Sequence, residues 1–155
     1  MAYLKLVNHL YCDNNAISYV FRYITDFDKT KGYTGTRNII LDYAPLIMEA
    51  TQKAFLKEDG NRLIHFIISF SETESYSKYD ALTIAHQTAL LFPDHQIIFG
   101  VHSGTDNIHI HFMINSVSFV DGSKLAPDKT LLNALQAHCS QFIPNLQCHS
   151  EKRRV

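Results

Sequence analysis

Three histidines lie close together in the segment His102-Ser-Gly-Thr-Asp-Asn-Ile-His109-Ile-His111. Imidazole nitrogens are common ligands of transition-metal ions, and a site with three protein ligands keeps coordination positions open for water or substrate. An ion held in this way polarises a bound oxygen and offsets the negative charge that builds up in a transition state. The segment therefore predicts a catalytic metal site rather than a closed structural one.

The sequence around these histidines predicts a β-hairpin that brings all three to one face of a sheet. Residues 104–107 (Gly-Thr-Asp-Asn) supply a four-residue loop of turn-forming types. The resulting register pairs His102 with His109 and Gly100 with His111, and Gly100 is expected to leave space above the sheet. The opposite face is then apolar and carries Ile97, Phe99, Val101, Ile108, Ile110, Phe112 and Ile114. A slip of one residue would put His102 into this apolar face, so the pattern selects its own register.

The other histidines carry weaker signals. An isolated histidine is more often an ordinary surface or core side chain than a ligand, and this interpretation is adopted for His9, His86, His95, His138 and His149. His65 is intermediate, because it alternates with apolar residues on an expected strand over about 62–71. We expect His65 to border the metal site.

A metal-bound phosphate needs an attacking group, and tyrosine is the best candidate. Tyr19 and Tyr23 lie one turn apart on an expected helix that runs to about Ile24. Tyr23 is the preferred nucleophile because it ends that helix beside a basic stretch, and Tyr19 is the alternative. The hydroxyl of a tyrosine can form a covalent phosphoester intermediate.

The charges are unevenly distributed, although the formal net charge is only −1. A value so close to zero argues against indiscriminate coating of DNA. Basic side chains gather at Arg22, Lys29, Lys31 and Arg37, whereas acidic ones dominate residues 62–121. We expect a basic surface that binds the phosphates of a nucleic acid beside the cation site, with two ordinary solvated faces as the alternative.

The organisation of the chain predicts a single domain over residues 1–155 of the α+β class, either complete or the N-terminal part of a longer protein. An antiparallel sheet carries the three histidines, and helices pack on its other face. The expected helices cover about 14–24, 45–56, 78–92 and 128–142. The expected strands cover about 4–7, 62–71, 96–101 and 108–119, and residues 25–43 are expected to form a loop.

The sequence also bears on the compartment. No apolar run reaches the ~18 residues of a membrane span, so no membrane segment is expected. Cys12, Cys139 and Cys148 form an odd set without a CxxC pair. This usage is typical of reduced thiols in the cytoplasm.

Three segments occur in an order and spacing that resemble a known family. Residues 23–30 (Tyr-Ile-Thr-Asp-Phe-Asp-Lys-Thr) look like its tyrosine motif. Residues 65–74 (His-Phe-Ile-Ile-Ser-Phe-Ser-Glu-Thr-Glu) resemble its second motif, and residues 102–117 resemble its histidine motif, which leads into Asn-Ser-Val. The family is that of the relaxases, or mobilisation nucleases, of plasmids and integrative elements, within the HUH endonuclease superfamily. The resemblance extends from residue 19 to about 125.

The resemblance implies a fold and a reaction. A single DNA strand at an origin of transfer is nicked when Tyr23 attacks a phosphate held by an ion on His102, His109 and His111. A 5′-phosphotyrosine link and a free 3′-hydroxyl result, and the reverse reaction rejoins the strand. The family implies Mg or Mn as the divalent ion in use, while neutral imidazoles also suit Zn or Ni. Accessory relaxosome and coupling proteins are the implied partners.

The histidine motif departs from that of many relatives. An Asp two residues after the first histidine and a further His five after it are replaced by Gly104 and Asn107. An acidic partner that orients a ligand histidine is therefore assigned to two candidates. Glu74 matches by motif and Asp106 by proximity.

Three alternatives stay open at this point. The first is a replication initiator endonuclease of the same superfamily, although initiators usually carry their tyrosine after the histidines. The second is a catalytically inactive relative that binds single-stranded DNA. The third is an unrelated three-histidine metallohydrolase of small molecules, which would need a closed pocket.

Overall fold

The computed structural model describes residues 1–104 and 107–149 and shows an α+β fold, as expected. The strands are β1 (Ala2–Leu6), β2 (Thr34–Arg37), β3 (Leu63–Phe70), β4 (Ile97–His102), β5 (His109–Asn115) and β6 (Gln147–His149). The helices are α1 (Ala16–Thr25), α2 (Phe27–Thr30), α3 (Ala44–Ala54), α4 (Lys78–Ala89) and α5 (Lys129–Cys139), with a 3-10 turn at Leu41–Tyr43. None of these helices combines the length and the apolar character that crossing a bilayer requires.

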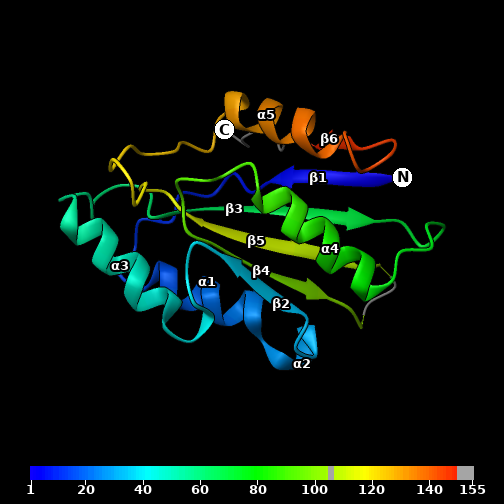
Figure 1. Ribbon diagram of the computed structural model, residues 1–155, viewed down its shortest axis with the longest axis horizontal. Coiled ribbons are helices and arrows are strands. Elements are labelled where there is room, and N and C mark those ends of the chain that lie inside the picture. The colour runs from blue at the N-terminus through cyan, green and yellow to red at the C-terminus, as the bar shows by residue number, and fades with distance from the viewer. Residues whose placement is uncertain (105–106, 150–155) are drawn as a thin grey trace.

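The strands form one sheet in the order β2-β4-β5-β3-β1-β6. All neighbouring strands are antiparallel except β1 and β6, which are parallel (Figure 1). In the central β4–β5 hairpin, His102 pairs with His109 and Gly100 pairs with His111. This is the register predicted from the alternation of side chains. The three histidines therefore share one face of the sheet.

The apolar face of the sheet forms the larger core. Its centre is a layer of buried aromatic rings, in which Phe66 and Phe112 stack at 4.3 Å and Phe99 lies 5.9 Å from Phe112. Helices α4 and α5 contribute buried side chains to this core. Figure 1 shows α4 in front of the sheet. Helices on the face opposite the histidines were expected, and α4 and α5 meet that expectation.

Helices α1 and α3 cover the histidine face, which the sequence pattern did not predict. They bury side chains against Leu63, Ile98 and Met113, which continue that face away from the histidines. Only one end of this face is polar, so its apolar remainder must be covered from water. The sheet thus has helices on both faces. Helix α1 packs on the apolar part of the histidine face, and its C-terminal end reaches the histidines.

Residues 25–43 are more ordered than the loop that was expected. Asp26 caps the short helix α2 by accepting a hydrogen bond from the backbone N–H of Asp28 at 3.0 Å. Strand β2 then adds to the outer edge of β4, with Thr34 opposite Gly100. Its sequence, Thr-Gly-Thr-Arg, has no apolar alternation. An edge strand held mainly by backbone hydrogen bonds leaves little trace in side-chain patterning.

The Asn-Ser-Val segment at the end of β5 has a structural role. Asn115 is fully buried, and its amide group donates to Gln96 (2.8 Å) and to the carbonyl of Met48 (3.2 Å). Its carbonyl oxygen accepts from Gln52 at 2.8 Å and from the backbone N–H of Val117 at 3.1 Å. A buried amide with all these partners rigidifies the junction between α3 and the sheet.

Candidate active site

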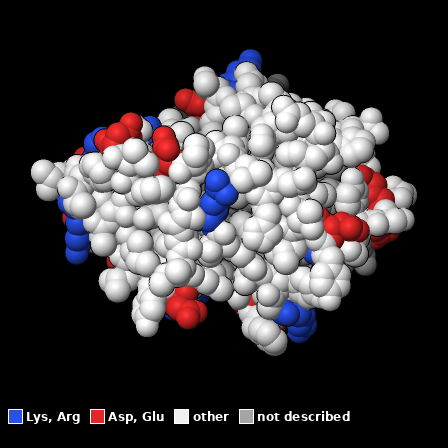
Figure 2. Space-filling model, viewed as in Figure 1, with Lys and Arg blue, Asp and Glu red and all other residues white. Residues whose placement is uncertain are grey.

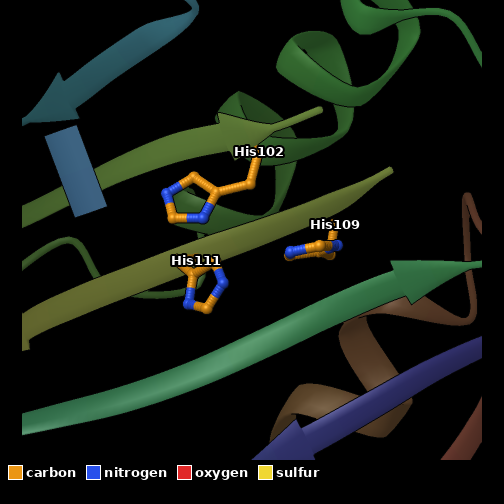
Figure 3. Close-up of side chains that lie close together, drawn as sticks. All are labelled: His102, His109 and His111. Atoms are coloured by element: carbon orange, nitrogen blue, oxygen red, sulfur yellow. The ribbon is translucent and has the colours of Figure 1, made fainter. Parts of the chain in front are cut away.

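The three histidines converge, as the predicted register requires. One nitrogen of each ring lies within 4.8 Å of the other two. The ring centroids of His102 and His111 are 4.2 Å apart, and Figure 3 shows the three rings from β4 and β5 facing one another. Metal–nitrogen bonds of ~2.1 Å allow ligand atoms to be at most about 4.2 Å apart. Small ring rotations therefore bring all three onto one ion, and the donor set fits a divalent transition metal.

Each of the three rings is held through one nitrogen. Nε2 of His102 lies 3.0 Å from the carbonyl oxygen of Ile24, and Nδ1 of His109 lies 3.0 Å from that of Asn107. Nδ1 of His111 lies 3.0 Å from Nε2 of His65. His65 thus borders the site, as expected. These contacts orient the rings and leave the second nitrogen of each to act as a ligand.

The environment keeps the inner histidines neutral. His102 and His111 are each only 4% exposed, whereas His109 is half-buried. Burial lowers the pKa of His102. Burial, together with the neighbouring histidines, lowers the pKa of His111 to about 2. A neutral imidazole is the form that binds a metal, so little proton release opposes binding at neutral pH.

Gly100 admits the backbone of α1 to the site. A Cβ atom at this position would lie 2.2 Å from the carbonyl oxygen of Ile24 and 3.1 Å from Cγ2 of Thr30. The space that was expected to stay open above Gly100 is therefore filled by the end of α1 and by α2. Because the same carbonyl contacts His102, the glycine allows the helix to meet the hairpin.

Tyr23 lies beside the histidines. Its ring centroid is 5.4 Å from that of His102 and 5.2 Å from that of His111, both edge to face. The side chain is 45% exposed, so a substrate can reach it. The ammonium group of Lys29 lies 5.5 Å from the centroid of the Tyr23 ring. The Tyr23 ring, the Lys29 ammonium group and the three candidate metal ligands thus lie side by side.

Comparison with known proteins agrees with this geometry. Residues 23–143 match the family model described as "Relaxase: MobA/VirD2-like, nuclease domain". The chain belongs to the relaxase family. The matched region begins at Tyr23 and includes all three histidines, so it contains both halves of the site.

Two curated relatives illustrate the similarity of this relaxase domain to known proteins. Protein rlx of Staphylococcus aureus is 31% identical over 123 residues, which cover 76% of this chain and 36% of that protein. Protein TraI of Escherichia coli is 31% identical over 104 residues, which cover 62% of this chain and 14% of that protein. The chain therefore spans about a third or less of the length of these relatives. No solved structure matches it.

The alternative nucleophile lies deeper in the relaxase domain. Tyr19 is half-buried one turn before Tyr23, and its ring centroid lies 6.4 Å from that of Tyr11. Burial raises the pKa of the Tyr19 hydroxyl, with a further contribution from Asp13. In the described part of the chain, the tyrosine ring that contacts the candidate metal-ligand histidines is that of Tyr23.

The basic residues do not form one cluster. Arg22 precedes Tyr23 in α1, and Lys29 and Lys31 lie in or directly after α2. Arg37 pairs with Ile97 at the opposite end of β4 from His102, which is five residues, or roughly 16 Å, away along the strand. On the α4 side of the sheet, Figure 2 shows basic and acidic side chains intermingled.

Of the two acidic candidates, Glu74 and Asp106, only Glu74 lies within the described residues. The carboxylate of Glu74 forms an ion pair with the amino group of Met1 (2.5 Å) and accepts a hydrogen bond from the hydroxyl of Ser71 (3.0 Å). Asp106 lies outside the described residues. Within residues 1–104 and 107–149, the three candidate ligand histidines form hydrogen bonds with two backbone carbonyls and with His65.

Sequence reasoning missed two parts of the site. The carbonyl group of Ile24 has no side-chain signature, because any residue could supply it. Tyr11, whose hydroxyl lies 3.0 Å from Nδ1 of His65, is a single tyrosine in a short irregular segment and belongs to no motif. The glycine at position 100, opposite His111, was the one sequence feature that could have indicated a backbone segment packed closely against the site.

Proposed function

We propose that this relaxase domain nicks and rejoins one strand of DNA through a covalent link to Tyr23. The observation that carries the proposal is the position of the Tyr23 ring, 5.4 Å and 5.2 Å from the rings of two metal-ligand histidines, His102 and His111. At these distances, the Tyr23 hydroxyl and an ion on the histidines would reach the same phosphate group. Transfer between two phosphoesters needs no nucleotide fuel.

The reaction exchanges one ester bond for another. The hydroxyl oxygen of Tyr23 forms a bond to phosphorus, and the bond from phosphorus to the 3′ oxygen breaks. The hydroxyl proton is lost and the 3′ oxygen gains a proton, so the products are a 5′-phosphotyrosine and a free 3′-hydroxyl. Lys29 lies over the tyrosine ring, where its charge stabilises the negative charge that develops during attack. The reverse steps rejoin the strand.

His102, His109 and His111 would hold the divalent ion. When bound, the ion supplies Lewis-acid polarisation of a phosphoryl oxygen. Mg or Mn is the proposed ion in use, and the three imidazoles also suit Zn or Ni. Hydrogen bonds to the carbonyl oxygens of Ile24 and Asn107 and to His65 orient the three rings for this role.

The proposed substrate is single-stranded DNA at an origin of transfer, and the proposed role is plasmid or mobile-element mobilisation in the cytoplasm. Arg22, Lys29 and Lys31 lie near Tyr23 and would contact phosphates beside the cleavage site. Arg37 would contact a more distant phosphate. Glu74 and Asp106 stay candidates for acidic support of the histidines. Accessory relaxosome and coupling proteins are proposed partners.

The test is the formation of a covalent adduct. The protein is incubated with a random pool of labelled single-stranded oligonucleotides and Mn²⁺, and the products are separated on a denaturing gel. We expect a protein band that carries DNA, its loss in Tyr23→Phe with DNA binding retained, and its persistence in Tyr19→Phe. An adduct of full yield in Tyr23→Phe would exclude Tyr23 as the nucleophile.

A further inference from the structure

A chain of hydrogen bonds runs from the interior of the protein to the candidate metal site. The hydroxyl of Tyr11 lies 3.0 Å from Nδ1 of His65, and Nε2 of His65 lies 3.0 Å from Nδ1 of His111. All three side chains are buried. Tyr11 and His65 are not among the three metal-ligand candidates, yet both nitrogens of His65 are engaged in this chain.

Hydrogen bonds can be donated along this series in only one direction if His111 is to bind a metal. Because Nδ1 of His111 faces His65, its Nε2 is the nitrogen that is left for an ion. A neutral imidazole that binds through Nε2 carries its proton on Nδ1 and donates it. Nε2 of His65 must then accept, so the proton of His65 lies on Nδ1 and is donated to the oxygen of Tyr11. Both nitrogens of His65 and Nδ1 of His111 then have hydrogen-bond partners.

The surroundings of His65 and Tyr11 favour the neutral form of each side chain. Burial lowers the pKa of His65 to about 4, with smaller contributions from His102 and Lys5. Burial raises the pKa of Tyr11 to about 12, with smaller contributions from Tyr19 and Tyr23. A neutral His65 also fits its two hydrogen bonds, because one of its nitrogens accepts from His111 and the other donates to Tyr11.

The backbone of Tyr11 is held by two hydrogen bonds of its own. Its N–H donates to the side-chain oxygen of Asn61 at 2.8 Å, and its carbonyl accepts from the N–H of Arg62 at 2.8 Å. These bonds attach the segment after β1 to the start of β3. The position of the Tyr11 backbone therefore does not depend on the histidines that its side chain supports.

We propose that Tyr11 and His65 are positioning residues that fix the tautomer and ring orientation of His111 so that its Nε2 faces the ion. This inference rests on the proposed three-histidine ion site. The other two ligand histidines contact backbone carbonyls, of Ile24 and Asn107. Among the described residues, His111 is the ligand whose ring is held by another side chain, so mutation can test its support directly.

The first measurement uses the metal-free protein. Nitrogen-15 NMR of the imidazole groups reports which nitrogen of each histidine carries the proton. We expect His111 to be protonated on Nδ1 in the wild type, and to become a mixture of tautomers in His65→Leu. His65→Gln keeps an acceptor near the position of Nε2 and should restore the Nδ1-protonated form. A tautomer of His111 that is unchanged in folded His65→Leu would overturn the proposal.

The second measurement is the affinity for Mn²⁺ by titration calorimetry. Loss of a residue that orients a metal ligand typically reduces metal affinity 10- to 100-fold. We expect a loss of about this size in His65→Leu, a smaller loss in Tyr11→Phe, and near wild-type affinity in His65→Gln. An affinity within twofold of wild type in both His65→Leu and Tyr11→Phe would also overturn the proposal.

His95 provides a matched control. It is as buried as His65, and its Nδ1 lies 2.8 Å from the carbonyl oxygen of Asn115, away from the site. His95→Leu should lower stability without changing Mn²⁺ affinity or the tautomer of His111. If His65→Leu does not fold, Tyr11→Phe decides, because it removes one hydroxyl and keeps the ring. If the wild type binds no Mn²⁺, the proposed ion site is refuted. The NMR of the metal-free protein still tests whether His65 fixes the tautomer of His111.

Discussion

Gly100 and Ile24 approach each other so closely that a Cβ atom on the glycine would lie 2.2 Å from the carbonyl oxygen of the isoleucine. That carbonyl also lies 3.0 Å from Nε2 of His102. One close contact therefore joins the end of α1, which carries Tyr23, to the strand that carries the candidate metal ligand His102. Three predictions follow from the site and one from the surrounding charges.

Gly100→Ala should separate the two halves of the site. The added methyl group cannot be accommodated without moving α1, because the atom that it meets belongs to the backbone. We expect the free energy of unfolding to fall by about 1–3 kcal/mol, the usual cost of overpacking. We also expect a lower yield of the DNA adduct than in the control variant. Thermal unfolding and the denaturing-gel assay measure the two effects. Gly104→Ala is the control, because a Cβ there has nothing within 4 Å, although its positive φ adds some strain. Equal adduct yields in both variants would contradict the prediction.

His109→Ala should remove a metal ligand at little cost to the fold. Its ring is half-buried and its partner is the backbone carbonyl of Asn107, so few packing contacts are lost. We expect similar unfolding midpoints for wild type and variant in EDTA. Mn²⁺ at 100 times its dissociation constant should stabilise the wild type by about 2.7 kcal/mol and leave the variant unaffected. Equal stabilisation of both proteins would rule out His109 as a ligand.

The metal-free protein should lose stability in acid. Burial lowers the pKa of His65 to about 4 and that of His111 to about 2, both below the unfolded value of ~6.5. The unfolded chain therefore binds more protons, so stability is fully present above pH ~6.5 and is lost as the pH falls through these folded pKa values. Each group contributes up to about 1.4 kcal/mol per pH unit.

Urea unfolding in EDTA at a series of pH values measures this dependence. His65→Gln removes one of the buried histidines with a lowered pKa, so the stability of this variant should fall less steeply between pH 6.5 and 4. His138→Gln is a control at a half-buried histidine in α5, on the other side of the sheet, and its curve should follow the wild type. A stability that does not change over this interval in the wild type would show that the buried histidines are not held neutral.

The basic residues should differ in how they depend on DNA length. Lys29→Ala removes a charge beside the Tyr23 ring, and Lys31→Ala removes one at the end of α2. Each should weaken binding of short and long oligonucleotides alike and reduce the salt slope by about 1. Arg37→Ala should weaken only oligonucleotides long enough to reach the far end of β2. Fluorescence anisotropy at several salt concentrations measures these slopes. A loss with Arg37→Ala on the shortest oligonucleotides would contradict this placement.

The hairpin shows how far the sequence alone could lead. Strict alternation of apolar residues with His109 and His111, closed by a four-residue turn, admits one register, and the structure has that register. Adjacent strands bring alternating side chains together whatever the rest of the fold does. The convergence of the metal ligands was therefore determined locally. The ends of the helices were predicted less well, since α4 and α5 stop three residues before their expected ends.

The partners of those ligands were decided only by the tertiary structure. The Ile24 carbonyl reaches His102 because α1 packs across the sheet onto Ile98 and Met113, and Tyr11 reaches His65 because its backbone is tied to Asn61. Such contacts join residues far apart in the chain, and they use backbone atoms or single side chains without periodicity. Local sequence patterns record which face of a strand is buried, but not which distant segment comes to cover it.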